Sequence, residues 1–450
     1  MSIRNQFLEQ VTANIKMKET RASVQKELDQ HIESIARTLE KKGHSNEEAE
    51  LMAVKQMGSP LKLSKQFNKV YKPKVDWILV LGFACALMIG MIAMYVMTTQ
   101  THSYLSWPMN LSWPMKIFGT LLSIFVVYCL FKFNYRLWKK SGKKMGLIFY
   151  ALGTFGLLLY TIAPYPLAVV INGYKSLRIF SVSVDSSLFI VFYLISWALL
   201  LDSPKRKAWK LIVFVGVSSF LFIVVSPIPT IMMYILMLIA MYMYEGRHTW
   251  KRTAAIVGLW LGTFFMFISS TWNEYRYARL MSLMPIRNNP GTASSYISIQ
   301  VKKLLENAKW HPQSLADSHI ILPEAHTDFI FVTLTYSLGW IFSGIILLTL
   351  GFLLIRVLLM VPHVNDAFGR LLIIGGVSIY GFQLIFNVGM VFGIFPYAGY
   401  SLPFVSYGTL PTMLNSIMIG LFLSVYARKN VPLGLKSAQD APQRCSKSQN

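Results

Sequence analysis

Ten apolar runs dominate this chain, and each is long enough to cross a lipid bilayer as a helix. A membrane-spanning helix needs about 17 to 25 consecutive, mostly apolar residues. Runs of that length predict an all-α polytopic membrane protein with about ten transmembrane helices. The ten runs lie at roughly 75–97, 115–134, 145–164, 186–202, 208–225, 229–245, 253–270, 329–355, 370–392 and 408–426.

The composition indicates a membrane body without a large soluble core, because 54% of the 450 residues are hydrophobic and only 14% are charged. The formal net charge is +23, but Lys and Arg lie mostly in short loops between apolar runs. That placement is typical of membrane topology, so nucleic-acid binding is not expected. The three cysteines, Cys85, Cys129 and Cys445, have no paired spacing and indicate neither a disulfide framework nor a metal cluster.

The basic loops predict the orientation of the chain, because cytoplasmic loops carry an excess of Lys and Arg. An even number of spans places both termini on one side. The short loops on the opposite side hold only Lys175 and Arg178, so both termini are predicted to be cytoplasmic and the long 271–328 loop to be outside. The basic residues after spans two, four, six and eight are Lys132, Arg136, Lys139, Lys140, Lys143, Lys144, Lys205, Arg206, Lys207, Lys210, Arg247, Lys251, Arg252, Arg356 and Arg370.

Three regions follow from the change in composition along the chain. Residues 1–72 form a predicted cytoplasmic helical domain, residues 75–430 the ten-span body, and residues 431–450 a cytoplasmic polar tail. A capping box at Ser45 to Glu48 starts one helix of the first region, and Gly58 ends that helix. Apolar residues at helical spacing give another helix its buried face: Val24, Leu28, Ile32, Ile35 and Leu39.

One acid stands out in the membrane body. The stretch LPEAHTDFIF, residues 322–331, places Asp328 where the long outer loop meets an apolar span. An ionisable group at the mouth of a membrane bundle is expensive to keep, so Asp328 is a candidate for a functional site. Its other interpretation is an N-terminal helix residue stabilised by the helix dipole.

The outer loop of residues 271–328 is too long for a bare connector. Segments 273–279 and 296–309 are predicted to be amphipathic helices, and they carry Arg279, Lys302 and Lys303. These cations form either a solvated basic face or a site for a pyrophosphate lipid, since fixed cations stabilise a departing phosphate.

The motifs together resemble the SEDS glycosyltransferases, the RodA and FtsW type of peptidoglycan polymerase. LPEAHTDFIF is similar to the family's loop-to-helix motif. The order of an Asn-x-Gly helix at Asn387 to Gly389, a Pro- and Gly-rich turn at 393–408, and a closing span with Asn415 is similar to its late signature. The resemblance covers about residues 75–430. Residues 1–72 loosely resemble the small helical domain that precedes some permease-like membrane proteins of Gram-positive bacteria.

The resemblance implies polymerisation of lipid II in the cytoplasmic membrane of a bacterium, with a class B penicillin-binding protein as partner. Asp328 would be the general base. Desolvation raises the pKa of a carboxyl group toward neutrality, which general-base catalysis requires. No organic cofactor is expected, and a divalent cation stays open as a counter-ion for the leaving undecaprenyl pyrophosphate.

Five further residues are candidate substrate contacts, each with a structural alternative. Glu324 and His326 flank Asp328, and their alternatives are a helix cap or solvated acid and a structural hydrogen bond. Asn387 is the polar residue of an apolar span, with interhelical bonding as its alternative. Ser406 and Tyr407 lie in the late turn, where Ser406 can instead cap the last helix.

The sequence departs from the family at its early acid and lysine. The stretch that stands there, Val182 to Ser187, has no lysine, and Asp185 is its candidate replacement acid. A second function therefore stays open beside the polymerase: a catalytically inactive scaffold or regulator that binds lipid II in a cell-wall complex. A transporter has little support, because no chain of ionisable residues runs through the spans.

Overall fold

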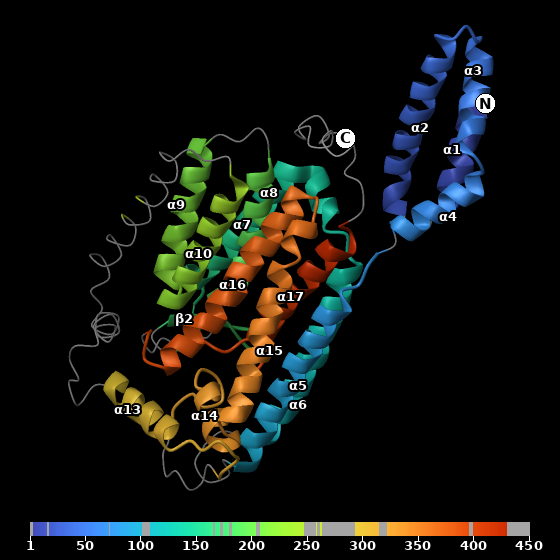
Figure 1. Ribbon diagram of the computed structural model, residues 1–450. Coiled ribbons are helices and arrows are strands. Elements are labelled where there is room, and N and C mark those ends of the chain that lie inside the picture. The colour runs from blue at the N-terminus through green and yellow to red at the C-terminus, as the bar shows by residue number, and fades with distance from the viewer. Residues whose placement is uncertain are drawn as a thin grey trace. The chain divides into compact units, whose positions relative to one another are not determined.

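The computed structural model describes residues 3–15, 18–71, 73–100, 109–164, 167–171, 174–179, 182–203, 208–246, 258, 262, 293–314, 322–395 and 399–429. Two compact units divide the chain, one of Met1–Val75 with Tyr426–Asn450 and the other of Asp76–Val425. Helices make up almost all of the described elements, so the predicted helical membrane class is confirmed (Figure 1).

The first unit contains four helices that share one apolar core. They are α1 (Ile3–Ala13), α2 (Lys18–Glu40), α3 (Asn46–Met57) and α4 (Pro60–Val70). The predicted capping box is present, because Ser45 and Glu48 bond each other's backbone N–H at the start of α3. Gly58 follows α3 at a positive φ of 79°. The buried core residues are Phe7, Leu8, Val11, Ile15, Val24, Leu28, Ile32, Ala36, Ala49 and Ala53.

Seven described helices of the second unit are long and apolar enough to cross a membrane. Two shorter apolar helices are α8 (Ile190–Asp202), which continues a 3-10 turn at Ser186–Phe189, and α9 (Ala208–Val225). Nine of the ten predicted runs therefore contain described helices, while the run at 253–270 lies almost wholly outside the described residues. The seven long helices are α5 (Trp77–Gln100), α6 (Met109–Lys132), α7 (Arg136–Ile162), α10 (Ile228–Glu245), α15 (Trp340–Leu358), α16 (Ala367–Val391) and α17 (Thr409–Ala427).

The prediction of one continuous span at 329–355 was wrong. The run is divided into α14 (Ile330–Leu338) and α15 by Gly339, which has φ 88°. The segment after α13 (Ala293–Glu306) pairs with the backbone at the break: Trp340 N–H donates to the Lys309 carbonyl at 3.1 Å, and Gln313 N–H donates to the Ser337 carbonyl at 3.0 Å. A Cβ on Gly339 would lie 2.5 Å from the Trp310 carbonyl oxygen, so only glycine allows this approach.

A small antiparallel sheet, which the sequence did not predict, lies between α7 and α8. Its strands are β1 (Ala168–Ile171), β2 (Tyr174–Ile179) and β3 (Val182–Val184), in the order β1-β2-β3. Ile171 pairs with Tyr174, so two residues connect β1 to β2. The connecting dipeptide is Asn-Gly in the sequence, the pair that two-residue hairpin turns favour most.

An ion pair joins α5 to α15. The Asp76 carboxylate accepts from Arg356 Nη2 at 2.7 Å and from its Nε at 3.1 Å. Asp76 also accepts from the Leu79 N–H at 3.0 Å, so the same carboxylate caps α5. The Asp76 side chain is 1% exposed and that of Arg356 is 27% exposed, so loss of either partner strands the other charge in a poorly hydrated place.

Replacing Arg356 alone should therefore cost more than replacing both partners. We expect Arg356→Met to destabilise the protein by about 3 kcal/mol, and the double variant Asp76→Asn with Arg356→Met to recover much of that loss. Asn at position 76 keeps an oxygen to cap α5. Thermal unfolding of the purified protein in detergent measures both, and strictly additive effects would show that the two groups are not coupled.

Candidate functional site

The acid singled out in the sequence, Asp328, lies in a compact turn just before α14. The Glu324 carbonyl accepts the N–H groups of Thr327 at 3.1 Å and Phe329 at 3.2 Å, which closes the turn. Glu324 has a positive φ of 53°, an uncommon conformation for a residue with a side chain. Asp328 is half-buried, and α14 begins two residues later with no side-chain cap. Asp328 therefore lies one residue before the N-cap, Phe329, and outside the helix.

Three consecutive carbonyls of this turn accept hydrogen bonds from residues late in the chain. The His326 carbonyl accepts from Tyr407 N–H at 2.9 Å. The Thr327 carbonyl accepts from Ser406 Oγ at 2.7 Å, and the Asp328 carbonyl accepts from Asn387 Nδ2 at 2.9 Å. The backbone that carries the acid is therefore fixed by residues 59 to 81 positions away. We call these three bonds the carbonyl clamp.

The donors of the carbonyl clamp also organise the loop between α16 and α17, which we call the late loop. Asn387 Nδ2 donates a second hydrogen bond to the Tyr400 carbonyl, and Ser406 Oγ accepts from Leu402 N–H at 2.7 Å. Asn387 is 0% exposed and Ser406 is 2% exposed. These two side chains, which the sequence suggested as substrate contacts, are buried, and these hydrogen bonds join them to backbone groups. Ser406 was also predicted to cap the last helix, but its hydroxyl bonds the Thr327 carbonyl and the Leu402 N–H instead.

Gly399 explains how the Asp328 carboxylate fits against the late loop. A Cβ on Gly399 would lie 3.0 Å from Asp328 Oδ2, and the residue has a positive φ of 45°. Glycine therefore satisfies both the backbone conformation and the close approach of the carboxylate. The acid of the early motif and the glycine of the late motif form one site.

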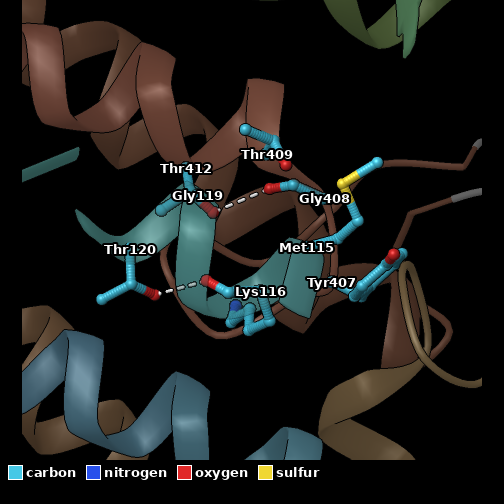
Figure 2. Close-up of a pocket in the computed structure, with 8 residues that line it drawn as sticks. All are labelled: Met115, Lys116, Gly119, Thr120, Tyr407, Gly408, Thr409 and Thr412. Atoms are coloured by element: carbon cyan, nitrogen blue, oxygen red, sulfur yellow. Dashed lines mark hydrogen bonds between the residues drawn. The ribbon is translucent and has the colours of Figure 1, made fainter. Parts of the chain in front are cut away.

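Lys116, which the sequence interpretation overlooked, supports the late loop from α6. It is 5% exposed, and its ammonium donates to the carbonyls of Phe404 at 3.2 Å and Ser406 at 3.0 Å. A lysine in an apolar span is the signal that could have identified it. Figure 2 shows Lys116 in a narrow pocket between α6 and the start of α17, lined also by Met115, Gly119, Thr120, Tyr407, Gly408, Thr409 and Thr412.

His326 and Tyr407 lie side by side next to this lysine. Their ring centroids are 5.7 Å apart, and both residues are half-buried. A second small pocket is lined by Lys116, His326 and Tyr407 together with apolar residues of α5 and α14. Burial lowers the pKa of His326, and the nearby Glu324 opposes that shift. The imidazole is therefore neutral at pH 7, which suits a hydrogen-bonding role.

The other predicted site residues lie in several places. Glu324 is exposed, and its carboxylate accepts from Thr327 Oγ1 at 2.7 Å. Lys302 and Lys303 are exposed on α13, where Lys302 pairs with Glu306 of the same helix at 3.7 Å. Arg279 and the predicted helix at 273–279 lie outside the described residues. The structure confirms an amphipathic helix in the other predicted segment as α13, with Val301 and Leu304 buried.

Asp185, the candidate replacement acid, lies between β3 and the turn that leads into α8. Ser176 Oγ donates to its carboxylate at 3.3 Å. Burial raises the pKa of the Tyr400 phenol, and the negative charge of Asp185 adds to that shift. Within the described ranges, no group of three or more His, Cys, Asp or Glu residues could hold a metal ion.

Comparison with known proteins identifies the family. Residues 76–431 match the family described as cell cycle protein, which comprises FtsW, RodA and SpoVE. The chain belongs to this family. The SEDS resemblance of the sequence is therefore confirmed, and the matched region begins where the second structural unit begins.

Two relatives show how far the similarity extends. The probable peptidoglycan glycosyltransferase FtsW of Trichlorobacter lovleyi is 30% identical over 172 residues, which are 37% of this chain and 45% of that protein. The stage V sporulation protein E of Bacillus subtilis is 38% identical over 109 residues, 24% of this chain and 30% of that protein. The matched segments thus span less than half of either relative.

Two solved structures share the fold. A chain of a peptidoglycan synthase complex that coordinates polymerization and crosslinking gives a TM-score of 0.62 at 17% identity, covering 78% of this chain and 97% of that one. The rod shape determining protein RodA of Thermus thermophilus gives a TM-score of 0.52 at 16% identity, and the match covers 79% of this chain and 97% of that one. At these identities the likeness concerns the fold alone.

The carbonyl clamp can be tested at its serine in this SEDS protein. Ser406→Ala removes the partner of both the Thr327 carbonyl and the Leu402 N–H, so we expect it to destabilise the protein by about 1–3 kcal/mol. Ser401→Ala is the matched control, the same change at a half-buried position of the same loop, with an expected loss below about 0.5 kcal/mol. Thermal unfolding measures both, and equal losses would argue against the clamp.

The depressed pKa of His326 predicts a pH dependence of stability. The unfolded imidazole has a pKa of about 6.5, so on acidification the unfolded chain binds a proton before the folded one does. Stability attributable to neutral His326 should therefore be complete above that pKa and decline below it. We expect the unfolding temperature of wild type to fall more than that of His326→Gln from about pH 7.5 to about 5.5. Parallel declines would exclude His326 as the titrating group.

Proposed function

We propose that this member of the SEDS family is a peptidoglycan glycosyltransferase that polymerises lipid II at the outer face of the bacterial cytoplasmic membrane. The observation that carries the proposal is Asp328, whose backbone is fixed by the carbonyl clamp and whose carboxylate packs against Gly399. A general base needs a carboxylate that is held in place at a partly desolvated site. The FtsW relatives, described as probable peptidoglycan glycosyltransferases, support the choice of reaction.

In the proposed reaction, a sugar hydroxyl of one lipid-linked disaccharide attacks the anomeric carbon of a second lipid-linked glycan. Asp328 accepts the hydroxyl proton as the new C–O bond forms. The bond from the anomeric carbon to the pyrophosphate oxygen breaks, and undecaprenyl pyrophosphate leaves with the electron pair. Attack opposite the leaving group inverts the anomeric centre. Pyrophosphate leaves as an anion and needs no proton from a general acid, so one base and positive charge near the leaving group suffice.

The leaving pyrophosphate requires positive charge nearby. Lys302 and Lys303 on α13 are exposed and can reach an anionic group in solution or at a membrane surface. Lys116 is less suited to this task because two backbone carbonyls already take its ammonium hydrogens.

The proposal includes an orientation and a partner. Both termini face the cytoplasm, as the basic loops indicate, which places the turn of Asp328 outside. A class B penicillin-binding protein is the proposed partner, because the structure with the TM-score of 0.62 comes from a complex of polymerization and crosslinking. The process served is cell-wall synthesis in shape, division or sporulation.

A second function is favoured by one departure from the family motifs. The stretch Val182–Ser187 lacks the lysine and the early acid of the family, and only Asp185 stands near their place. A chain that lost those groups could bind lipid II without polymerising it, as a scaffold or regulator of a cell-wall complex. The intact stretch 322–331 with Asp328 supports the polymerase over this alternative.

Polymerisation of lipid II by the purified protein tests the proposal, alone and with a class B penicillin-binding protein. We expect Asp328→Asn to lower the rate of glycan chain formation at least about a hundredfold, because removal of a general base typically costs that much or more. Glu306→Gln on α13 is the control for loss of a negative charge in the same outer region. Glycan chains resolved on a gel give the readout.

Each outcome of this experiment separates the two functions. Loss of chains in Asp328→Asn but not in Glu306→Gln supports the polymerase. Undiminished chains in Asp328→Asn would overturn the role of Asp328 as base. A folded wild-type protein that binds lipid II but forms no chains with any partner would favour the scaffold.

A further inference from the structure

Helix α4 carries a face of three lysines that point away from the core of the first unit. Lys62, Lys65 and Lys69 are all exposed, and their spacing of three and four residues places them on one side of the helix. The opposite side packs Leu63 and Phe67 against the buried core. The lysines therefore form a continuous basic surface, which we call the α4 lysine face.

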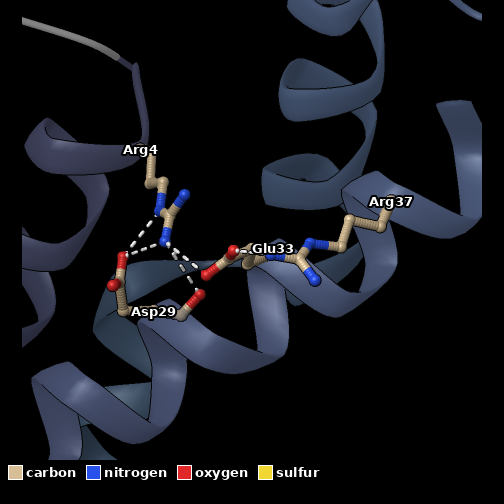
Figure 3. Close-up of polar contacts among 4 residues, drawn as sticks. All are labelled: Arg4, Asp29, Glu33 and Arg37. Carbon is tan, nitrogen blue, oxygen red and sulfur yellow. Dashed lines mark hydrogen bonds and ion pairs between the residues drawn. The ribbon is translucent and has the colours of Figure 1, made fainter.

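The α4 lysine face differs from the rest of the first unit in having no acidic neighbours on its own helix. Two arginines of α1 and α2 are instead paired with acids, as Figure 3 shows: Arg4 pairs with Asp29 at 2.6 Å and with Glu33 at 3.7 Å, and Arg37 pairs with Glu33 at 2.6 Å. No ion pair joins the three α4 lysines to another described residue. The sequence of α4 contains no Asp or Glu, whereas α3 contains three Glu and one Lys.

The chain keeps the α4 lysine face close to the lipid bilayer. Helix α4 ends at Val70 and the membrane-spanning α5 begins at Trp77. Seven residue steps of fully extended chain cover at most about 25 Å, so the last residue of α4 lies within that distance of the start of α5. Lys62, eight residues earlier, lies about 12 Å further along the helix. Trp77 is 73% exposed at the first position of α5, and tryptophan is enriched at membrane interfaces.

We propose that the α4 lysine face binds the anionic phospholipid headgroups of the leaflet in which α5 begins. Three lysines without acidic partners on their helix complement a negatively charged surface, and the chain holds them within its reach. Leu61, 60% exposed, and Val70, 52% exposed, border the lysine face on either side. Apolar residues at the edges of a basic helical face can enter the headgroup region, as they do in interfacial helices. The proposal is independent of the catalytic role of Asp328.

The chain connection favours a lipid surface over a protein as the binding partner of the α4 lysine face. A protein partner would have to be recruited, whereas the bilayer is always present at the end of a six-residue connector, from Tyr71 to Asp76. The effective concentration of the surface is therefore high even where each lysine contributes little. Binding would fix the first unit with α4 toward the membrane and the acidic α3 on another side.

Lysine reactivity in the full-length protein tests the proposal without any substitution. The protein is placed in nanodiscs of phosphatidylcholine alone or of phosphatidylcholine with phosphatidylglycerol. An amine-reactive acetylating reagent is added, and mass spectrometry follows each lysine. A surface potential of about −30 mV concentrates protons about threefold, so fewer amines are neutral and reactive beside an anionic membrane. We expect Lys62, Lys65 and Lys69 to react at least about threefold more slowly with the anionic lipid present.

Lys41 and Lys42 are the matched controls within the same unit. Both are exposed and follow α2, at the far end of the unit from α4 (Figure 1). Their rates should change little between the two lipid mixtures. High salt should restore the rates of the α4 lysines, because it screens charges beyond a few ångströms.

Other outcomes would overturn the proposal. If the acetylation rate changed between the two lipid mixtures by the same factor for the α4 lysines and for the controls, the α4 lysine face would be a solvated basic face. Slow reaction of the α4 lysines in both lipid mixtures would identify a protein surface as the occupant. None of these results depends on polymerase activity, so failure here is distinguishable from failure of the proposed reaction.

Discussion

The site depends on one set of interactions, the three hydrogen bonds of the carbonyl clamp. A loop before α14 has no regular ladder to hold it, so its backbone carbonyls need partners from elsewhere in the chain. Tyr407 N–H, the Ser406 hydroxyl and the Asn387 amide supply those partners in succession. Ser406 and Tyr407 belong to the late loop, which Asn387 of α16 and Lys116 of α6 also bond. The position of Asp328 therefore depends on α6, α16 and the late loop as well as on its own turn.

The carbonyl clamp also joins two motifs that are far apart in the sequence. The early stretch 322–331 provides the acid, and the late Gly- and Ser-containing turn provides the surface against which the acid packs. Gly399 is needed where the carboxylate approaches, and Ser406 is needed where two buried backbone groups would otherwise lose a partner. Their nearness in space follows from contacts that no spacing in the sequence reveals.

The sequence predicted what depends on local composition and missed what depends on distant contacts. The apolar spans and the helix caps of the first unit were predictable, because length, periodicity and capping residues are local signals. The break at Gly339 was not, since an apolar run gives no sign that residues 309–313 will pair with it. Lys116 carries a local signal, a cation in an apolar span, but the sequence does not reveal its partners, which are carbonyls nearly 300 positions away. The hairpin of β1 and β2 was missed although Asn172-Gly173 is a strong local signal.

The break at Gly339 makes α14 a short strut with a joint at each end. One joint is the turn that carries Asp328, and the other is the glycine against which residues 309–313 are paired. A rod of nine helical residues is about 14 Å long and does not bend appreciably, so it transmits tilt from one joint to the other. The segment after α13 and the turn of Asp328 therefore lie at opposite ends of one short rigid helix, so a displacement of residues 309–313 would be felt at the turn of Asp328.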